Sequence, residues 1–223
     1  MPSLLVCGIT QSDVAIHFTS SILRMQSELA STPNLKVDFE FFTSVNEALT
    51  YFHKQKHFDR CVVIDGQMSV DPGFILHQDL SKDFVIASYP LRTYDWDRIK
   101  TKLCESNESL SHVGVVYNYD PVTAIPQPGG THVKLAPETR NIQMKIFHIS
   151  RVVIDTILQS SNPHGDSRVP IYNEGVIDGR VCTPDEHFAA LWGGPIYADI
   201  LAKTKNVGPF DFSGVVGNRK QLR

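Results

Sequence analysis

Hydrophobic and polar positions follow two regular spacings over the first 90 residues of the chain. Four short apolar runs have the length and composition of buried strands, and the segments between them carry apolar residues at helical spacing. The pattern predicts strands at residues 3–10, 35–42, 60–65 and 84–89, and helices at residues 16–30, 45–53 and 74–80. This order predicts an α/β fold with a mostly parallel central sheet, right-handed crossovers and flanking helices.

Two of these segments carry clear local signals. Residues 60–65 place Cys-Val-Val-Ile between Arg60 and Asp65, which indicates a strand buried on both faces. The helix at 45–53 follows Ser44, and Glu47 comes three residues after that serine. This pairing predicts a capping box at the start of the helix.

The second half of the chain is less regular. It has predicted strands at 113–119 and 131–135, a segment at 144–149 that leads into a helix at 150–158, and a short helix at 184–191. The connecting segments are rich in proline, glycine and polar residues. Since no linker separates two cores, we expect a single domain over residues 1–223.

Composition and charge exclude several classes of function. The 223 residues can bury a core that needs no disulfide framework. The net charge of −3, from 21 basic and 24 acidic residues, provides no footprint for nucleic acid. The four cysteines have no Cys-x-x-Cys spacing, so we expect a reducing compartment and a cytoplasmic location. No apolar run reaches the roughly 20 residues that span a bilayer, so we expect no direct membrane insertion.

Ligands of open parallel α/β sheets bind beyond the carboxyl ends of the strands. The first such loop, residues 8–13, offers Gly8 for close approach of a ligand and the polar side chains of Thr10, Gln11, Ser12 and Asp13. It has neither Gly-x-Gly-x-x-Gly nor the Gly-Lys-Ser/Thr of a phosphate loop. Its polar residues also fit a simpler role, since Ser12 or Asp13 can cap the following helix.

Asp65 is the most informative single residue. A carboxylate directly after a buried strand needs a hydrogen-bonding partner or a metal ion, because an unpaired buried charge is costly. The alternative is a local role, in which Asp65 accepts a hydrogen bond from the turn that follows it.

Several short motifs occur in an order that resembles one family. They are Val62-Val63-Ile64-Asp65-Gly66-Gln67, Asp71-Pro72-Gly73-Phe74, Ile86-Ala87-Ser88-Tyr89-Pro90, Asp95-Trp96, Thr183-Pro184-Asp185-Glu186-His187-Phe188 with Trp192, and Val207-Gly208 with Phe210 and Gly214. This series is similar to GT-A glycosyltransferases of large DNA viruses (chlorovirus-like) and bacteria. The resemblance covers most of the chain and implies a single-domain GT-A fold and, for a viral protein, the host cytoplasm.

The resemblance implies transfer of a hexose or deoxyhexose from a UDP- or GDP-linked sugar to a glycan or glycoprotein acceptor. Residues 1–100 would form the nucleotide-sugar-binding half and residues 101–223 the acceptor and catalytic half. Asp185 matches the family's catalytic base, and Glu186 is the second candidate. The donor-binding residues would be Gly8, Thr10, Gln11, Asp13, Asp65, Gly66, Gln67, Arg92 and Trp192.

These side chains also have structural alternatives. Asp185 and Glu186 in a first helical turn favour the helix dipole without any catalysis. Arg92 can be a solvated surface charge, and Trp192 can belong to the aromatic core.

Two positions depart from the family pattern. Gln67 stands where the family has a second aspartate, and Asn206 stands where it usually has a histidine. Both are neutral amides, so a Mn²⁺ or Mg²⁺ ion held by Asp65 and Gln67 would bind weakly.

Two other functions stay open. A nucleotidyltransferase on a similar sheet would need a basic residue in the first loop, and residues 8–13 contain none. A degenerate domain that binds nucleotide-sugars without turnover is consistent with Gln67 and Asn206.

Overall fold

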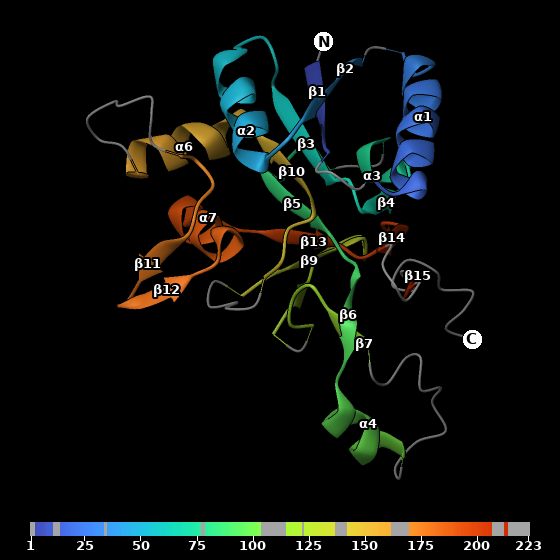
Figure 1. Ribbon diagram of the computed structural model, residues 1–223, viewed down its shortest axis with the longest axis vertical. Coiled ribbons are helices and arrows are strands. Elements are labelled where there is room, and N and C mark those ends of the chain that lie inside the picture. The colour runs from blue at the N-terminus through green and yellow to red at the C-terminus, as the bar shows by residue number, and fades with distance from the viewer. Residues whose placement is uncertain are drawn as a thin grey trace.

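The centre of the molecule is an eight-stranded mixed sheet, shown by a computed structural model (Figure 1). The structure describes residues 3–10, 14–33, 35–76, 79–103, 115–121, 123–136, 142–161, 170–206 and 212–213. From edge to edge the strands are β2 (Lys36–Phe42), β1 (Ser3–Ile9), β3 (Arg60–Asp65), β10 (Ile146–Ser150), β5 (Phe84–Ala87), β13 (Tyr197–Asp199), β9 (His132–Lys134) and β8 (Ile125–Pro126).

Most strands of this sheet run in one direction. β1 pairs in parallel with β2 and β3, and β13 pairs in parallel with β5. β10 lies antiparallel between β3 and β5, so those two strands share a direction. β9 is also antiparallel to its neighbours. The carboxyl ends of β1, β3, β5 and β13 therefore lie at one edge of the sheet, where β10 begins, and this edge is where ligands of such sheets bind.

Helices cover both faces of the sheet (Figure 1). One face carries α1 (Ile16–Ala30) and the short α3 (Gly73–Leu76), and the other carries α2 (Val45–Lys54), α6 (Arg151–Ser161) and α7 (Pro184–Trp192). A hairpin of β6 (Pro90–Tyr94) and β7 (Val115–Tyr117) leads away from the sheet toward α4 (Trp96–Leu103).

Two smaller sheets complete the described chain. β4 (Met68–Val70) pairs with β14 (Thr204–Asn206), which pairs with β15 (Phe212–Ser213). β11 (Gly175–Ile177) and β12 (Arg180–Cys182) form a hairpin beside α7. Its two-residue turn has positive φ at both Asp178 (51°) and Gly179 (76°), as the tight turns of hairpins require.

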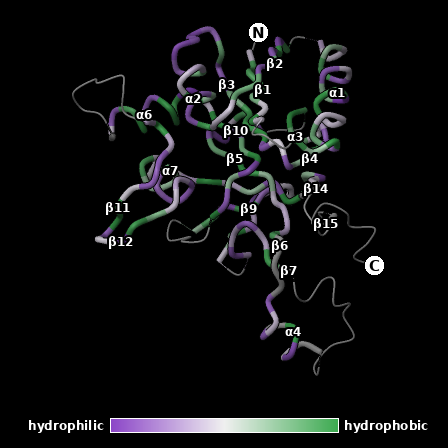
Figure 2. Tube along the Cα trace, viewed as in Figure 1, coloured by the Kyte–Doolittle hydropathy of each residue, from purple (hydrophilic) through white to green (hydrophobic). Residues whose placement is uncertain are grey.

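Successive residues of the central strands alternate between two hydrophobic cores. In β1, Leu5 and Cys7 face the core beneath α2, α6 and α7, whereas Leu4 and Val6 face the core beneath α1. Hydrophobic positions concentrate in these central strands (Figure 2). Burial on both faces explains why the strands are continuous apolar runs and do not alternate with polar residues.

The regular half of the sequence predicts its elements closely. α1 and β3 have the expected bounds, and β1, β2, α2 and β5 differ from expectation by no more than two residues at either end. The helix expected at 74–80 is wrong in extent. The described helix ends at Leu76, and by residue 79 the chain turns, with the Asp79 carboxylate accepting from the backbone N–H of Ser81.

The capping box expected at α2 forms in a modified way. The Ser44 hydroxyl accepts from the backbone N–H of Glu47 at 3.2 Å, as expected. The Glu47 carboxylate, however, accepts from the backbone N–H and the hydroxyl of Thr43, one residue before the cap. The full reciprocal box occurs instead at α7, between Thr183 and Glu186.

Candidate active site

The loops after β1 and β3 are tied together by backbone hydrogen bonds. The N–H of Gly66 donates to the carbonyl of Ile9 at 2.8 Å, and the N–H of Ala15 donates to the carbonyl of Gly66 at 2.9 Å. A Cβ atom on Gly66 would lie 2.5 Å from the Ile9 carbonyl oxygen, so the loops can approach this closely only at a glycine. These contacts set the position of Asp65, the last residue of β3.

Asp65 makes the local hydrogen bond that the sequence allows as the alternative to a metal contact. Its Oδ1 accepts a hydrogen bond from the backbone N–H of Gln67 at 2.8 Å, which forms an Asx turn. The carboxylate is only partly buried, at the edge of the sheet where the parallel strands end. The Asx turn orients the carboxylate, and it is compatible with a ligand contact.

Asp185 is held by hydrogen bonds from two other segments. The hydroxyl of Tyr172 donates to its Oδ1, and the backbone N–H of Met144 donates to the same carboxylate. Burial raises the pKa of Asp185 above its usual value, while these two hydrogen bonds and the charge of Lys145 act in the opposite direction. A carboxylate with a raised pKa is a better proton acceptor than an exposed one.

Two tyrosines connect Asp65 with Asp185. Burial raises the pKa of Tyr89, and the negative charges of Asp185 and Asp65 raise it further. Burial also raises the pKa of Tyr172, and Asp185 and Asp65 again contribute. Backbone contacts link the two carboxylates as well, since Met144 donates to the Asp185 carboxylate and the next residue, Lys145, accepts from the N–H of Asp65. The structure thus brings together the two aspartates that the sequence singles out.

Lys145 lies between the two carboxylates. Its carbonyl accepts from the N–H of Asp65 at 2.8 Å, and its own N–H donates to the Tyr89 hydroxyl oxygen at 3.1 Å. Its positive charge lowers the pKa of Asp185. The cluster of Asp65, Tyr89, Lys145, Tyr172 and Asp185, called the carboxylate cluster below, therefore contains one cation.

Two asparagines fix the backbone of the tyrosines. The side chain of Asn118 accepts from the N–H of Tyr89 at 2.9 Å and donates to the carbonyls of Ala87 and Gln143. The side chain of Asn46 donates to the carbonyl of Tyr172 at 2.7 Å and accepts from its N–H at 2.8 Å. Both phenols are thereby positioned by side chains from distant parts of the chain.

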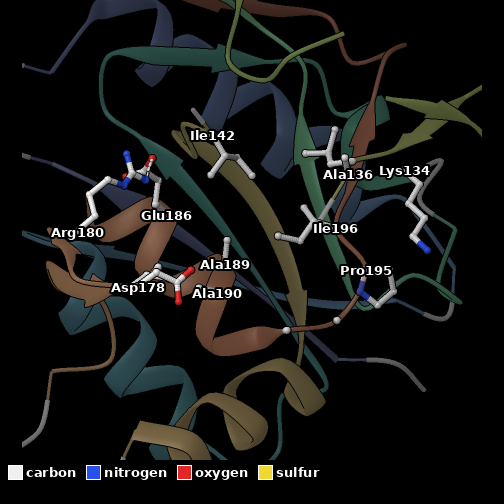
Figure 3. A pocket seen from close by; sticks show the side chains of 14 residues that line it. Lys134, Ala136, Ile142, Asp178, Arg180, Glu186, Ala189, Ala190, Pro195 and Ile196 are labelled. Atoms are coloured by element: carbon white, nitrogen blue, oxygen red, sulfur yellow. Dashed lines mark hydrogen bonds and ion pairs between the residues drawn. The ribbon is translucent and has the colours of Figure 1, made fainter. Parts of the chain in front are cut away.

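A cavity of about 660 Å³ lies beside α7, the hairpin of β11 and β12 and the residues ahead of β13 (Figure 3). Glu186 and Ile142, which line it, are close neighbours in sequence of Asp185 and Met144. The lining consists of Lys134, Leu135, Ala136, Ile142, Ile177, Asp178, Arg180, Glu186, Ala189, Ala190, Gly193, Gly194, Pro195 and Ile196. Its volume is in the usual range for small-molecule sites.

Glu186, the second candidate for the base, has structural partners. Its Oε2 accepts from the backbone N–H of Thr183 at 3.0 Å, and its Oε1 lies 3.1 Å from Arg180. Glu186 thus caps α7 and joins it to the hairpin of β11 and β12. Asp185, with its partners Tyr172 and Met144, remains the stronger candidate.

The first loop differs in detail from the expectation. Gly8 was expected to admit a ligand, but a Cβ there would lie 2.7 Å from the Phe41 ring and 2.8 Å from the Phe18 ring. Gly8 is therefore required for packing of these rings. The N–H of Thr10 donates to the carbonyl of Phe42. Gln11, Ser12 and Asp13 lie outside the described residues.

Trp192 and Arg92, which the resemblance also assigns to the donor, lie on α7 and β6. Trp192 donates through Nε1 to the carbonyl of Pro195 at 3.2 Å, and its indole packs against Gly194. These contacts account for Trp192 as part of the protein's own packing. Arg92 belongs to β6, and its side chain is outside the described part of the structure.

Asp65 is the carboxylate that the sequence offers to a divalent cation. Among the described residues, no three His, Cys, Asp or Glu side chains gather in one place. Asp65 already accepts one backbone hydrogen bond, and the side chain of Asn206 is not described. Mg²⁺ sites often combine one or two carboxylates with substrate phosphates, and Asp65 can serve such a site. The weak site at Asp65 and Gln67 stays a prediction.

The sequence did not single out Tyr172, Lys145, Asn46 or Asn118 as site residues. Tyr89 appears in the family motifs, but Tyr172 stands in an irregular segment with no periodic pattern. The Asp178-Gly179 pair is a typical hairpin signal and could have predicted β11 and β12.

Within the described residues, no helix has the length and apolar character needed to cross a membrane. No protein-family model matches the chain, and no curated protein matches it.

Comparison with solved structures finds a similar fold. The crystal structure of A197 from STIV is 12% identical, with a TM-score of 0.50, and the match covers 96% of this chain and 90% of that one. A crystal structure of HddC from Yersinia pseudotuberculosis is 15% identical over 70% of this chain and 79% of that chain, with a TM-score of 0.32. The same protein complexed with GMP-PN is 13% identical over 74% of this chain and 81% of that chain, with a TM-score of 0.30. The likeness to A197 agrees with the sheet topology and confirms the α/β fold class.

Proposed function

We propose that this protein is a glycosyltransferase, which moves a sugar from a nucleoside diphosphate donor to a hydroxyl group of an acceptor. One observation carries the proposal. Asp65, at the carboxyl end of β3, and Asp185, at the start of α7, are hydrogen-bonded to the adjacent residues Lys145 and Met144, just ahead of β10 at the ligand-binding edge of the sheet. Sugar transfer needs a donor-binding group and a proton acceptor close together, and these two carboxylates supply that pair.

In the proposed reaction, an acceptor hydroxyl oxygen attacks the anomeric carbon of the donor sugar. Its proton passes to the Asp185 carboxylate, the new carbon–oxygen bond forms, and the bond to the diphosphate breaks with its electron pair on the leaving oxygen. The raised pKa of Asp185 favours proton uptake. Tyr172, through its hydrogen bond to Oδ1, holds the carboxylate in one orientation.

The departing diphosphate needs positive charge close by. Lys145 can supply this charge, because it is the cation of the carboxylate cluster. Its backbone is hydrogen-bonded to both Asp65 and Tyr89. A divalent cation at Asp65, if bound with the donor, would supply further positive charge to the diphosphate. Arg92 retains its predicted role in binding the donor.

The second candidate function is a binding domain without turnover. It is favoured by the Asx turn of Asp65, which occupies one carboxylate oxygen, and by Gln67, which lacks the charge of an aspartate. Such a domain would bind a nucleotide-sugar and release no product.

Two measurements test these functions together. Thermal unfolding with a panel of UDP- and GDP-sugars, with and without Mn²⁺, reports binding, because a ligand of the native state raises the melting temperature. Release of free sugar from the donor that stabilises the protein reports turnover. Stabilisation with release supports the transferase, stabilisation alone supports the binding domain, and no stabilisation by any donor rejects both.

A further inference from the structure

More than half of the residues that line the cavity are aliphatic. None of its fourteen lining residues is aromatic, and eight are Leu, Ile, Ala or Pro. The aliphatic residues come from separate segments, with Ile142 ahead of β10, Ala189 and Ala190 on α7, and Pro195 and Ile196 ahead of β13 (Figure 3). Aliphatic walls favour a flexible hydrocarbon group, whereas sites that select flat rings commonly add aromatic faces.

Some of the charged side chains around this cavity have ion-pair partners and others do not. Arg180 and Glu186 form an ion pair at 3.1 Å on one side, with Asp178 in the nearby hairpin turn. Lys134 lies on the opposite side (Figure 3). In the part of the chain that the structure describes, the Lys134 ammonium has no ion-pair partner. An anionic group on a ligand would complement this end of the cavity.

We propose that the cavity binds an acceptor with an aliphatic chain and one anionic group, the chain lying on the apolar walls and the anion at Lys134. Glu186 on the cavity wall directly follows Asp185 in the first turn of α7, and this adjacency connects the cavity with the proposed base. The acceptor role rests on the proposed glycosyl transfer, but binding of the chain does not.

The direct test is titration calorimetry with a series of soluble n-alkyl phosphates, from butyl to decyl, below their micelle concentrations. Affinity is expected to rise about fourfold for each added methylene until the chain fills the cavity, as burial of a CH₂ group predicts. An affinity independent of chain length would overturn the inference. Alkyltrimethylammonium ions of equal length are expected to bind at least tenfold more weakly, and equal or tighter binding of these cations would contradict the role of Lys134.

Two variants test whether the alkyl chain of the ligand binds in this cavity. Ala190→Phe, at an exposed position of α7 in the lining, is expected to reduce octyl phosphate affinity on the order of tenfold or more by occupying the space. Ala30→Phe, at the exposed end of α1 on the other face of the sheet, is the matched control and is expected to bind normally. If Ala190→Phe does not fold, as shown by its circular dichroism, Ala136→Leu on the opposite wall makes the same test. Normal binding by a folded cavity variant would refute the site.

The same samples separate this inference from the proposed function. Donor binding without alkyl phosphate binding rejects the inference and leaves the transferase proposal intact. If alkyl phosphate binds the wild type but not the cavity-filling variants, and no nucleotide-sugar binds, the result supports the cavity site and rejects the transferase. Where the chain is bound, co-sedimentation with phosphatidylcholine vesicles containing phosphatidic acid supports a membrane lipid as its source, and its absence supports a free amphiphile.

Discussion

The two carboxylates of the candidate site are held by different kinds of structure. Asp65 is placed by the backbone, through β-sheet pairing, its N–H bond to Lys145 and the close approach of Gly66 to Ile9. Asp185 depends on the side chain of Tyr172, whose own backbone is held by Asn46, 126 residues away, and on one backbone N–H, that of Met144. The donor side of the site is therefore part of the sheet itself, whereas the proposed catalytic side requires the whole tertiary structure.

This difference predicts that substitutions on the two sides have different effects. Changes on the Asp65 side should alter donor affinity together with the stability of the sheet edge. Changes on the Asp185 side should alter turnover with little effect on donor affinity. The substitutions below follow in order of expected effect.

Replacement of the proposed base should have the largest effect. Asp185→Asn keeps the shape of the side chain and can still accept from the Tyr172 hydroxyl, but it cannot take up a proton. We expect turnover to fall at least about a hundredfold, as the loss of a general base commonly causes. Steady-state kinetics with donor and acceptor measure the change.

Glu186→Gln is the matched control for Asp185→Asn. A glutamine can still complete the capping box with Thr183, so α7 should persist. We expect turnover within a few-fold of the wild type. Near-normal turnover of Asp185→Asn together with an inactive Glu186→Gln would move the base by one residue.

Gly66→Ala tests the backbone side of the comparison. The new Cβ would lie 2.5 Å from the Ile9 carbonyl oxygen, so the loops after β1 and β3 must separate. We expect a loss of about 1–3 kcal/mol in the free energy of unfolding, typical of overpacking, and weaker donor binding. Urea unfolding and donor titration measure both. At saturating donor, turnover should stay close to normal, and a large fall there would contradict the division of roles.

Tyr172→Phe tests how Asp185 is held. The Tyr172 hydroxyl donates to the carboxylate and lowers its pKa, so its removal should raise the pKa of Asp185. The acidic limb of the pH–turnover profile should then move to higher pH, and turnover should fall roughly tenfold at a pH where the wild type is fully active. Tyr51→Phe, on α2 against Phe42, is the control and should leave the profile unchanged. A profile that does not move in Tyr172→Phe would show that this hydrogen bond does not act on the titrating group.

The strand between the two regions supplies the prediction with the smallest expected effect on turnover. Burial and then the positive charge of Arg60 lower the pKa of His148, on β10, to about 3. Its folded-state pKa therefore lies below the unfolded value of about 6.5, so its contribution to stability is complete above pH 6.5 and is lost as the pH falls toward 3. Over that window one such group changes the free energy of unfolding by up to about 1.4 kcal/mol per pH unit.

His148→Leu isolates this contribution from the acidic groups that also titrate. The free energy of unfolding of this variant should depend less steeply on pH between 6.5 and 4 than that of the wild type. Urea denaturation at several pH values measures the two slopes. Equal slopes would mean that His148 has the same pKa in the folded and unfolded protein, so that burial does not lower it.

The same comparison explains how much the sequence reveals. β1, β3, α1 and α2 follow from local periodicity, and Asp65 is recognisable because it ends a continuous apolar run. The fold class and the edge of the sheet that carries Asp65 can therefore be predicted from the sequence. The strands β4, β6, β11 and β14 have only three to five residues, which is too short for an amphipathic pattern to develop. These strands therefore depend on their pairing partners.

The surroundings of Asp185, the proposed catalytic side, were only partly predictable for a physical reason. Asp185 was found through its resemblance motif, but Tyr172 reaches it from an irregular segment that Asn46 clamps across the fold. Such contacts have no periodicity in the sequence. In the same way, Gly8 looks like a ligand-contacting glycine in the sequence, and only the packing of Phe18 and Phe41 shows what it accommodates.

The central claim is that Asp65 holds the donor while Asp185 serves the chemical step in a single site. Calorimetric titration of the stabilising nucleotide-sugar into the wild type, Asp65→Asn and Asp185→Asn tests it most directly. We predict that Asp65→Asn weakens donor binding at least about tenfold, the loss expected for a charged contact, and that Asp185→Asn binds donor within a few-fold of the wild type. Equal donor affinity in all three proteins, or a loss confined to Asp185→Asn, would contradict the account.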